Sequence, residues 1–156
     1  MRFKSFVGVL VAATLVLGGC TTQDKIIVSL DLIETAVAVA AAAHPSPATI
    51  AFLGIVTTAV PQAIAEEESA DSQAVKATLI AGYFGAAVAA SKLLSPEDQL
   101  AVAGIVAAIT SLLVELQQQG VVQASTVKVV TLTASQKAKL LDIATRTSQL
   151  RKQLGF

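Results

Sequence analysis

Two stretches of this chain, residues 77–91 and 99–114, contain no charged side chain. Alanine, which has the highest helix propensity, is the most frequent residue in both. A helix that is apolar on every side lies either in a protein core or in lipid. At about 1.5 Å per residue the two uncharged stretches would measure about 22 and 24 Å as helix, which is short of the roughly 30 Å hydrocarbon core of a bilayer. We therefore predict an all-α fold, a small alanine-rich helical bundle; insertion of these helices into a membrane is the alternative.

Composition supports the helical prediction and argues against one class of partner. Apolar residues make up 54% of the chain and aromatic residues only 4%, which favours helices over a β-sandwich core. The net charge is zero, whereas a protein that binds nucleic acid needs an excess of lysine and arginine for its phosphate contacts.

Local signals divide the middle of the chain into four helices. Ser46-Pro47 and Ser95-Pro96 each combine a capping residue with a proline suited to the first helical position. The predicted helices span about 24–43, 47–65, 71–94 and 96–119, within a bundle over 24–120. Four further residue positions define the expected ends: Pro61 should kink or end the second helix, Ser69 or Asp71 should cap the third, and Gly120 should end the fourth.

A weak internal repeat suggests that the bundle consists of two helical hairpins. Residues 38–47 and 87–96 agree at six of ten positions, at an offset of 49. Tandem hairpins would produce this pattern, and coincidence in an alanine-rich sequence is the alternative. Small residues allow helices to approach closely, and we assign this role to Gly54, Gly82, Gly85 and Gly104.

The composition changes after Gly120. Residues 121–133 are rich in β-branched side chains and predict an extended segment. A last helix, starting at Thr133 or Ser135 and ending near Leu154, completes a C-terminal region over 121–156. Its apolar positions recur at spacings of three and four residues: Leu140, Ile143, Thr147, Leu150 and Leu154. Its basic residues are Lys137, Lys139, Arg146, Arg151 and Lys152.

Charge is separated along the chain. Residues 24–115 carry a net charge of −7 and residues 128–156 a net charge of +5. We expect the last helix to pack on the acidic bundle of its own chain. Two alternatives are that one face of this helix binds a partner helix or lies on anionic lipid. This face is formed by Leu140, Ile143, Arg146, Leu150, Arg151, Lys152 and Leu154.

The residues needed for catalysis or metal binding are scarce. His44 is the only histidine, and its place before Pro45 is typical of a helix end. No second histidine or cysteine is present to complete a transition-metal site. The acidic run Glu66–Glu68 with Asp71 is interpreted as a solvated turn rather than a cation site, since adjacent residues do not converge on one point. We therefore expect no catalytic residues, no cofactor, no metal and no enzymatic activity.

The N-terminus predicts the location of the protein. Arg2 and Lys4 precede an uncharged apolar run, residues 6–17, which at about 18 Å is too short to span a bilayer. Such a run is typical of a secretory signal peptide. The run ends in Leu17-Gly18-Gly19, directly followed by Cys20, the only cysteine of the chain.

This arrangement resembles the lipobox of bacterial lipoproteins, and the resemblance covers about the first 20 residues. It implies that residues 1–19 are a signal peptide that is cleaved before Cys20. It further implies that Cys20 receives acyl chains, with residues 20–23 as a short tether. In a Gram-negative source the outer membrane would be the default destination, because Thr21 is not the aspartate that retains lipoproteins at the inner membrane.

The sequence therefore predicts a bacterial envelope lipoprotein that is held to membrane lipid through Cys20 and acts as a structural or protein-interaction module. A membrane-inserting helical protein, holin-like or pore-forming, is the alternative. The oligomeric state does not follow from the sequence.

Overall fold

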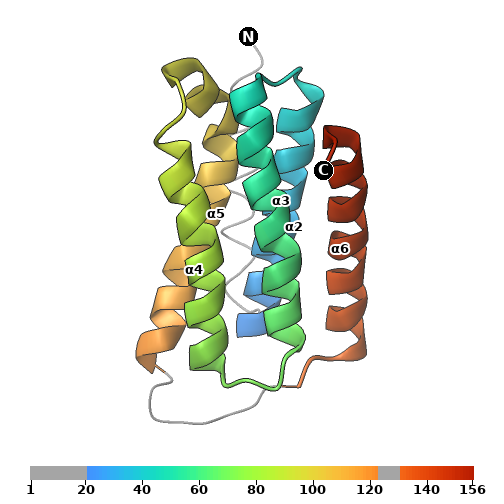
Figure 1. The fold of residues 1–156 in the computed structure, drawn as a ribbon. Coiled ribbons are helices and arrows are strands. Elements are labelled where there is room, and N and C mark those ends of the chain that lie inside the picture. The colour runs from blue at the N-terminus through green and yellow to red at the C-terminus, as the bar shows by residue number, and fades with distance from the viewer. Residues whose placement is uncertain (1–20, 123–130) are drawn as a thin grey trace.

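The computed structural model describes residues 21–122 and 131–156, which form five helices and no strand (Figure 1). The helices are α2 (Thr22–Ala42), α3 (Pro47–Glu68), α4 (Gln73–Ser91), α5 (Pro96–Val122) and α6 (Ala134–Leu154). The prediction of an all-α helical bundle is confirmed.

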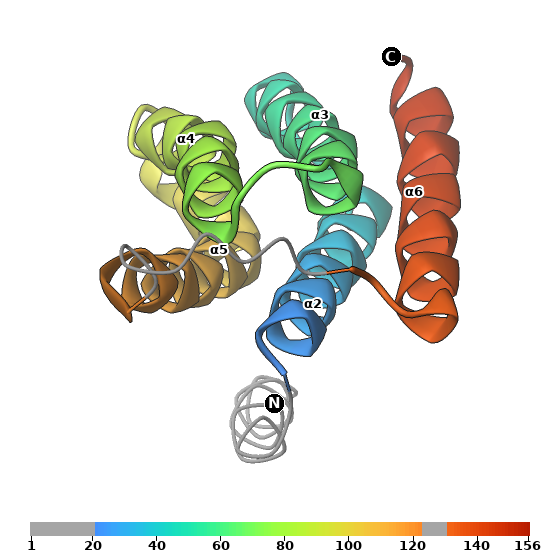
Figure 2. The ribbon, with the colours of Figure 1, turned by 90° about the horizontal axis from the view of Figure 1, so that it is seen from below.

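Helices α2 to α5 form an up-and-down bundle, and α6 lies along its side. Contacts join α2 to α5, α5 to α4 and α4 to α3, while α6 packs on α2 and α3. Figure 2 shows α6 on the opposite side of the α2–α3 pair from α4 and α5. The start of α2, the turn at 69–72 and the start of α6 lie toward the lower end of the bundle in Figure 1, and we call this end the N-cap end.

One hydrophobic core unites all five helices. Its largest fully buried apolar side chains include Phe52 of α3 and Phe84 of α4, and α6 contributes Leu140, Ile143 and Leu150. The C-terminal helix therefore belongs to the same packed unit as the four helices before it.

The helix starts at Ser46 and Ser95 occur as predicted, and one carboxylate joins them. Each serine Oγ accepts a hydrogen bond from a backbone N–H in the first turn of its helix, that of Thr49 at 3.1 Å and that of Asp98 at 3.2 Å. The Asp98 carboxylate also accepts hydrogen bonds from Ser46 Oγ at 2.6 Å and Ser95 Oγ at 2.7 Å. Asp98 thereby ties the first hairpin, α2–α3, to the second hairpin, α4–α5.

Two helices are longer than predicted. Helix α3 passes through Pro61 and continues to Glu68, because Ala63 and Ile64 beyond the proline are buried in the core. Helix α5 continues past Gly120 to Val122. In both helices the local stop signal is too weak to end the helix.

Further differences from the prediction concern helix α4 and the segment after α5. The N-cap of α4 is Ser72, and its side chain makes no capping hydrogen bond. Ser69 and Asp71, predicted as caps, instead interact with each other, since the Asp71 N–H donates to Ser69 Oγ at 3.2 Å. Helix α4 also ends at Ser91, earlier than expected. Most of the predicted extended segment, residues 123–130, lies outside the described residues.

Gly54, Gly82 and Gly85 do not have the role in helix packing that we assigned to them. A Cβ added at Gly82 or Gly85 would have no neighbour within 4 Å, so no helix packs against these two residues. A Cβ at Gly54 would lie 2.5 Å from the ring of Phe156. Gly54 therefore allows the approach of an aromatic side chain rather than of another helix.

Candidate functional site

The apolar face of α6, predicted as an interaction surface, contacts the protein's own bundle. Leu140, Ile143, Thr147 and Leu150 are buried, and Leu154 is half-buried. The helices that cover this face are α2 and α3. The packing that we expected of the last helix is therefore observed, and these side chains are not free for a partner.

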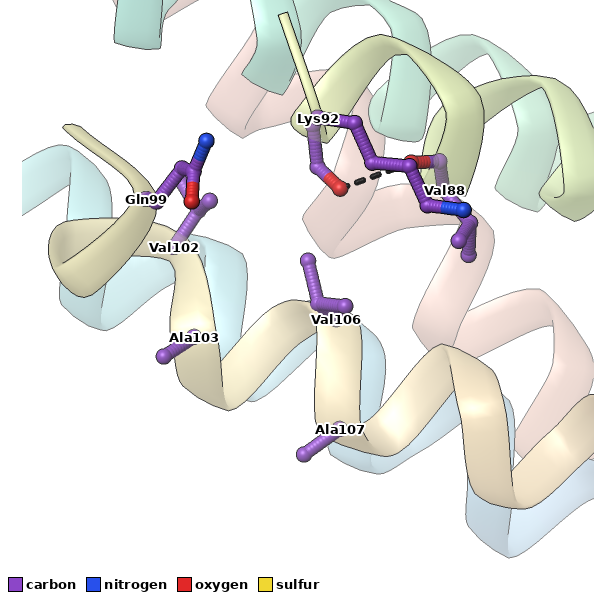
Figure 3. Close-up of a pocket in the computed structure, with 8 residues that line it drawn as sticks. Val88, Lys92, Gln99, Val102, Ala103, Val106 and Ala107 are labelled. Carbon is purple, nitrogen blue, oxygen red and sulfur yellow. Dashed lines mark hydrogen bonds between the residues drawn. The ribbon is translucent and has the colours of Figure 1, made fainter. Parts of the chain in front are cut away.

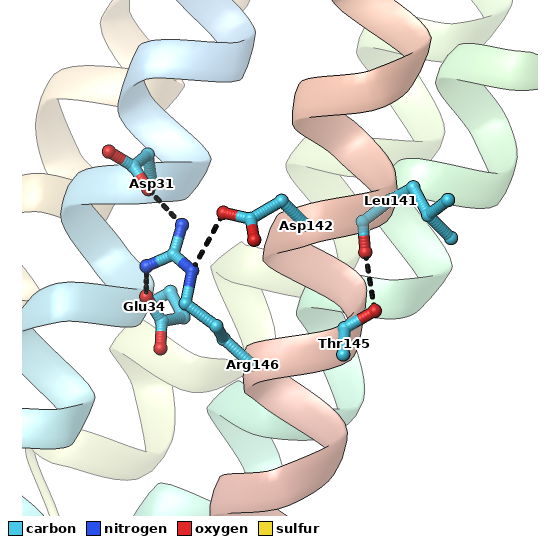
Figure 4. A network of polar contacts seen from close by, with 6 residues as sticks. All are labelled: Asp31, Glu34, Leu141, Asp142, Thr145 and Arg146. Carbon is cyan, nitrogen blue, oxygen red and sulfur yellow. Dashed lines mark hydrogen bonds and ion pairs between the residues drawn. The ribbon is translucent and has the colours of Figure 1, made fainter.

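Arg146 links the basic helix to the acidic bundle (Figure 4). Its guanidinium forms ion pairs with Asp31 and Glu34 of α2, and its Nε donates to Asp142 of α6 at 3.0 Å. The Glu34 side chain is only 5% exposed, so the pairing compensates a charge that has lost most of its water. Burial raises the pKa of Glu34, and Arg146 acts in the opposite direction. Arg146 is thus a point at which the basic C-terminal region meets acidic residues of the bundle.

A second polar contact joins α6 to α2 at the N-cap end. Gln136 Nε2 donates to Asp24 Oδ1 at 2.9 Å. Gln136 also closes the capping box of α6 with Thr133, and Asp24 closes that of α2 with Thr21. The hydrogen bonds from Gln136 and Thr21 hold the pKa of Asp24 below its usual value. The first turns of α2 and α6 are therefore joined through their caps.

Residues at the C-terminal end of α6 contact α3. Gly155 adopts a left-handed conformation with φ of 87°, and Phe156 N–H donates to the Arg151 carbonyl at 2.9 Å. This turn places the Phe156 ring on Gly54 of α3. Arg151 donates to Thr58 of α3 and lies over the same ring, with its Cζ 5.8 Å from the ring centroid. Sequence reasoning missed Phe156, and the available signal was Gly155, a residue type that favours a left-handed turn at a helix end.

Lys152 completes the set of predicted residues on α6, and its side chain is exposed. The predicted face thus divides into a buried apolar part, two arginines that contact α2 or α3, and one exposed lysine.

The acidic run at the end of α3 is not the solvated turn that we expected. Glu66 to Glu68 are helical, and Glu67 is only 1% exposed. Glu66 accepts a hydrogen bond from the Tyr83 hydroxyl at 3.1 Å. Only Glu68 and Asp71 are exposed as predicted. Helix α3 remains packed against the core as far as its last residues, and Glu67 is therefore buried.

Two open grooves lie on the surface of the bundle. The first, of about 410 Å³, lies between α4 and α5; it is lined mainly by Val88, Val102, Val106 and alanines, with Lys92 and Gln99 also lining it (Figure 3). The second, of about 660 Å³, lies between α2 and α6 and contains Asp31, Lys139, Asp142 and Arg146. Asp31 and Asp142 are already paired with Arg146. Neither groove presents a set of converging catalytic groups.

Within residues 21–122 and 131–156 no group of three or more histidine, cysteine, aspartate or glutamate residues is arranged to hold a metal ion. His44 is exposed and follows the end of α2 with a positive φ of 54°, which agrees with its prediction as a helix-end residue.

Three helices satisfy the length and composition of a membrane span: α3, α4 and residues 96–118 of α5. The bundle buries 50% of the most apolar window of α3 and 33% of each of the other two windows. Large apolar side chains on the outer faces of α4 and α5 include Val75, Leu79, Leu100 and Val114. The described helices are therefore compatible with membrane association by these criteria.

The predicted lipidation site directly precedes the described fold. Leu17, Gly18, Gly19 and Cys20 lie outside the described residues. The next residue, Thr21, is the N-cap of α2, and its Oγ1 accepts the Asp24 N–H at 3.3 Å. Thr22 and Gln23, expected to form a tether, are already helical. Consecutive Cα atoms are about 3.8 Å apart, so Cys20 is about one residue length from Thr21, the N-cap of α2.

Comparisons with protein-family models, curated proteins and solved structures give no match for this chain.

Proposed function

We propose that this protein is a bacterial envelope lipoprotein, anchored through acylated Cys20, in which a helical bundle serves as a structural or protein-interaction module. The signal-like N-terminus and the Leu17-Gly18-Gly19-Cys20 sequence are the basis of the proposal. The observation that supports it best is the capping box of Thr21 and Asp24 at the start of α2, because its first residue directly follows Cys20. Cleavage before Cys20 would remove none of the residues that form helices α2 to α6.

Anchoring at Cys20 has a geometric consequence for the module. Because no flexible spacer separates Cys20 from α2, the acyl chains would hold the N-cap end close to the membrane surface. The opposite end, with residues 43–46, residues 92–95 and Phe156, would be available to an envelope partner. Three acyl chains, at about 0.8 kcal/mol per buried methylene, would make the attachment durable.

Fatty-acid labelling and cell fractionation test the proposal. Cells that express the full chain are grown with a labelled fatty acid, and we expect the label on the wild-type protein and in the membrane fraction. The Cys20→Ser variant should carry no label. A Cys20→Ser protein that is labelled as strongly as the wild type would refute anchoring at this residue.

Membrane insertion is the second candidate, and the three helices that are apolar enough to span a bilayer favour it. A chain that starts at residue 20 and carries Cys20→Ala separates the two functions. A monodisperse helical protein in detergent-free buffer supports the anchored bundle. A strict requirement for detergent supports insertion.

A further inference from the structure

Three polar side chains are buried where α3 ends and α4 begins. Glu67 and Lys76 are each 1% exposed and Gln73 is 3% exposed. Lys76 Nζ donates to the backbone carbonyl of Glu67 at 2.8 Å, which leaves the Glu67 carboxyl unused. Among the described residues, neither Glu67 carboxyl oxygen has a hydrogen-bond partner, and neither do the amide oxygen and nitrogen of Gln73. Buried polar atoms without partners are rare and costly, so this hairpin end, residues 67–76, is a weak point in the packing.

Among the described residues around Glu67, one charge acts on its carboxyl. Helix α3 packs on α2, α4, α5 and α6. Charged residues that these helices carry toward the N-cap end are Asp24, Lys25, Lys76, Glu115, Lys137 and Lys139. Asp24 is bonded to Gln136, and Lys25 pairs with Glu115 at 3.5 Å. On α3 itself, Glu66 bonds to Tyr83 and Glu68 is exposed. The charged group that bears on the Glu67 carboxyl is the ammonium of Lys76.

The neutral form of the carboxyl suits this environment better than the ionised form. Desolvation penalises the carboxylate, and it raises the pKa of Glu67 to about 7 although Lys76 acts in the opposite direction. An ionised Glu67 would need hydrogen bonds from water, which the closed hairpin end does not admit.

The start of α4 also lacks a side-chain capping hydrogen bond that would hold its first turn in place. Thr21, Ser46 and Thr133 cap their helices through side-chain hydrogen bonds, whereas Ser72 makes none. The first backbone N–H groups of α4 therefore depend on water or on packing at this end.

We propose that the hairpin end is a pH-sensitive switch. It is closed while the Glu67 carboxyl carries a proton, and it opens to water when the carboxyl loses that proton. Opening gives the carboxylate water as a hydrogen-bond donor and exposes Gln73 and Lys76. The proposal rests on the contacts of Glu67, Gln73 and Lys76, and it stands whether or not Cys20 carries a lipid.

Hydrogen–deuterium exchange of the full-length protein between pH 5 and 8 tests the proposal. Peptides that cover residues 60–80 are followed, with rates corrected for the intrinsic pH dependence of exchange. If Glu67 is protonated in the closed state and ionised in the open state, the opening constant should rise about tenfold per pH unit between roughly pH 5 and 7. Above pH 7 it should level off.

Three variants identify the group that causes the pH dependence of opening. Glu67→Gln keeps the side chain neutral and should remove the pH dependence. Glu68→Gln, the matched control at an exposed neighbour, should retain it. Lys76→Met removes the charge that favours ionised Glu67 and should move the plateau to higher pH.

Several results would contradict this proposal. One is a wild-type protein whose exchange is flat from pH 5 to 8, and another is pH dependence that persists in Glu67→Gln. Equal loss of protection in α6 would indicate global unfolding instead. Should Glu67→Gln not fold, the carboxyl ¹³C shift of Glu67 is titrated in the wild type. A midpoint near 7 supports the proposal, and a midpoint at or below the model-peptide value of about 4.3 overturns it.

Discussion

The ring of Phe156 lies directly on the backbone of Gly54, 102 positions earlier in the chain, where even one methyl group would come within 2.5 Å of the ring. The contact joins the end of α6 to the middle of α3 and is enclosed by Arg151, which donates to Thr58 beside it. It places a side chain near the chain terminus in a defined position on the bundle.

We predict that Gly54→Ala displaces Phe156 and lowers the free energy of unfolding by about 1–3 kcal/mol, as overpacking does. Chemical denaturation measures the change. Gly82→Ala is the matched control, because nothing lies within 4 Å of the added methyl group. It should stabilise the protein by up to about 1 kcal/mol through helix propensity.

A double-mutant cycle tests the contact itself. In a Phe156→Ala background the new methyl group at position 54 meets no ring, so Gly54→Ala should be neutral or stabilising there. Equal destabilisation in both backgrounds would mean that Phe156 does not lie on Gly54.

Removal of Arg146 should leave Glu34 buried without its cation. Arg146→Met is expected to cost about 2 kcal/mol of unfolding free energy, less than for a fully buried pair because the arginine side chain is 35% exposed. The cost should shrink toward pH 4, where Glu34 takes up a proton and no longer needs the guanidinium. Urea denaturation at pH 4 and pH 8 measures both values.

The exposed Lys152 is the control for Arg146. Lys152→Met should change stability by less than about 0.5 kcal/mol at either pH. A cost of Arg146→Met that is equally small would show that the ion pairs with α2 do not hold α6 in place.

Neighbouring leucines test whether α6 is part of the core. Leu140 is fully buried, whereas Leu141 is 68% exposed. Leu140→Ala should cost about 2–5 kcal/mol, and Leu141→Ala should lie within about 0.5 kcal/mol of the wild type. Similar effects of the two substitutions would contradict the packing of α6 on α2 and α3.

Asp98 should make the bundle sensitive to acid. Hydrogen bonds from Ser46, Ser95 and Thr49 hold the pKa of Asp98 below its usual value. Its contribution to stability is therefore complete above the unfolded-state pKa and is lost as the pH falls through the lower folded-state pKa. Thermal denaturation from pH 2 to 6 should show a shallower acid-side loss of Tm for Asp98→Asn than for the wild type. If Tm falls with pH equally steeply in the two proteins, Asp98 does not contribute to the loss of stability in acid.

The parts of the fold that depend on short-range signals could be predicted from the sequence. Ser46-Pro47 and Ser95-Pro96 start helices because a capping hydroxyl and a proline act on the next turn. The spacing of Leu140, Ile143 and Leu150 predicts the buried face of α6, since these side chains repeat with the helix period.

Contacts between distant residues could not be predicted in this way. Nothing in the run of three glutamates indicates that only Glu67 enters the core, because its burial depends on α3 passing Pro61 and on α4 returning with Lys76. In the same way, the role of Gly54 depends on Phe156, which only the packing of α6 brings to it.

The central proposal, a bundle anchored through Cys20, is tested most directly by the intact mass of the protein purified from the membranes of its native cells. We predict a chain that starts at Cys20, with the mass of residues 20–156 plus a diacylglyceryl group and a further acyl chain. A mass that retains residues 1–19 and includes no fatty acid would contradict the proposal.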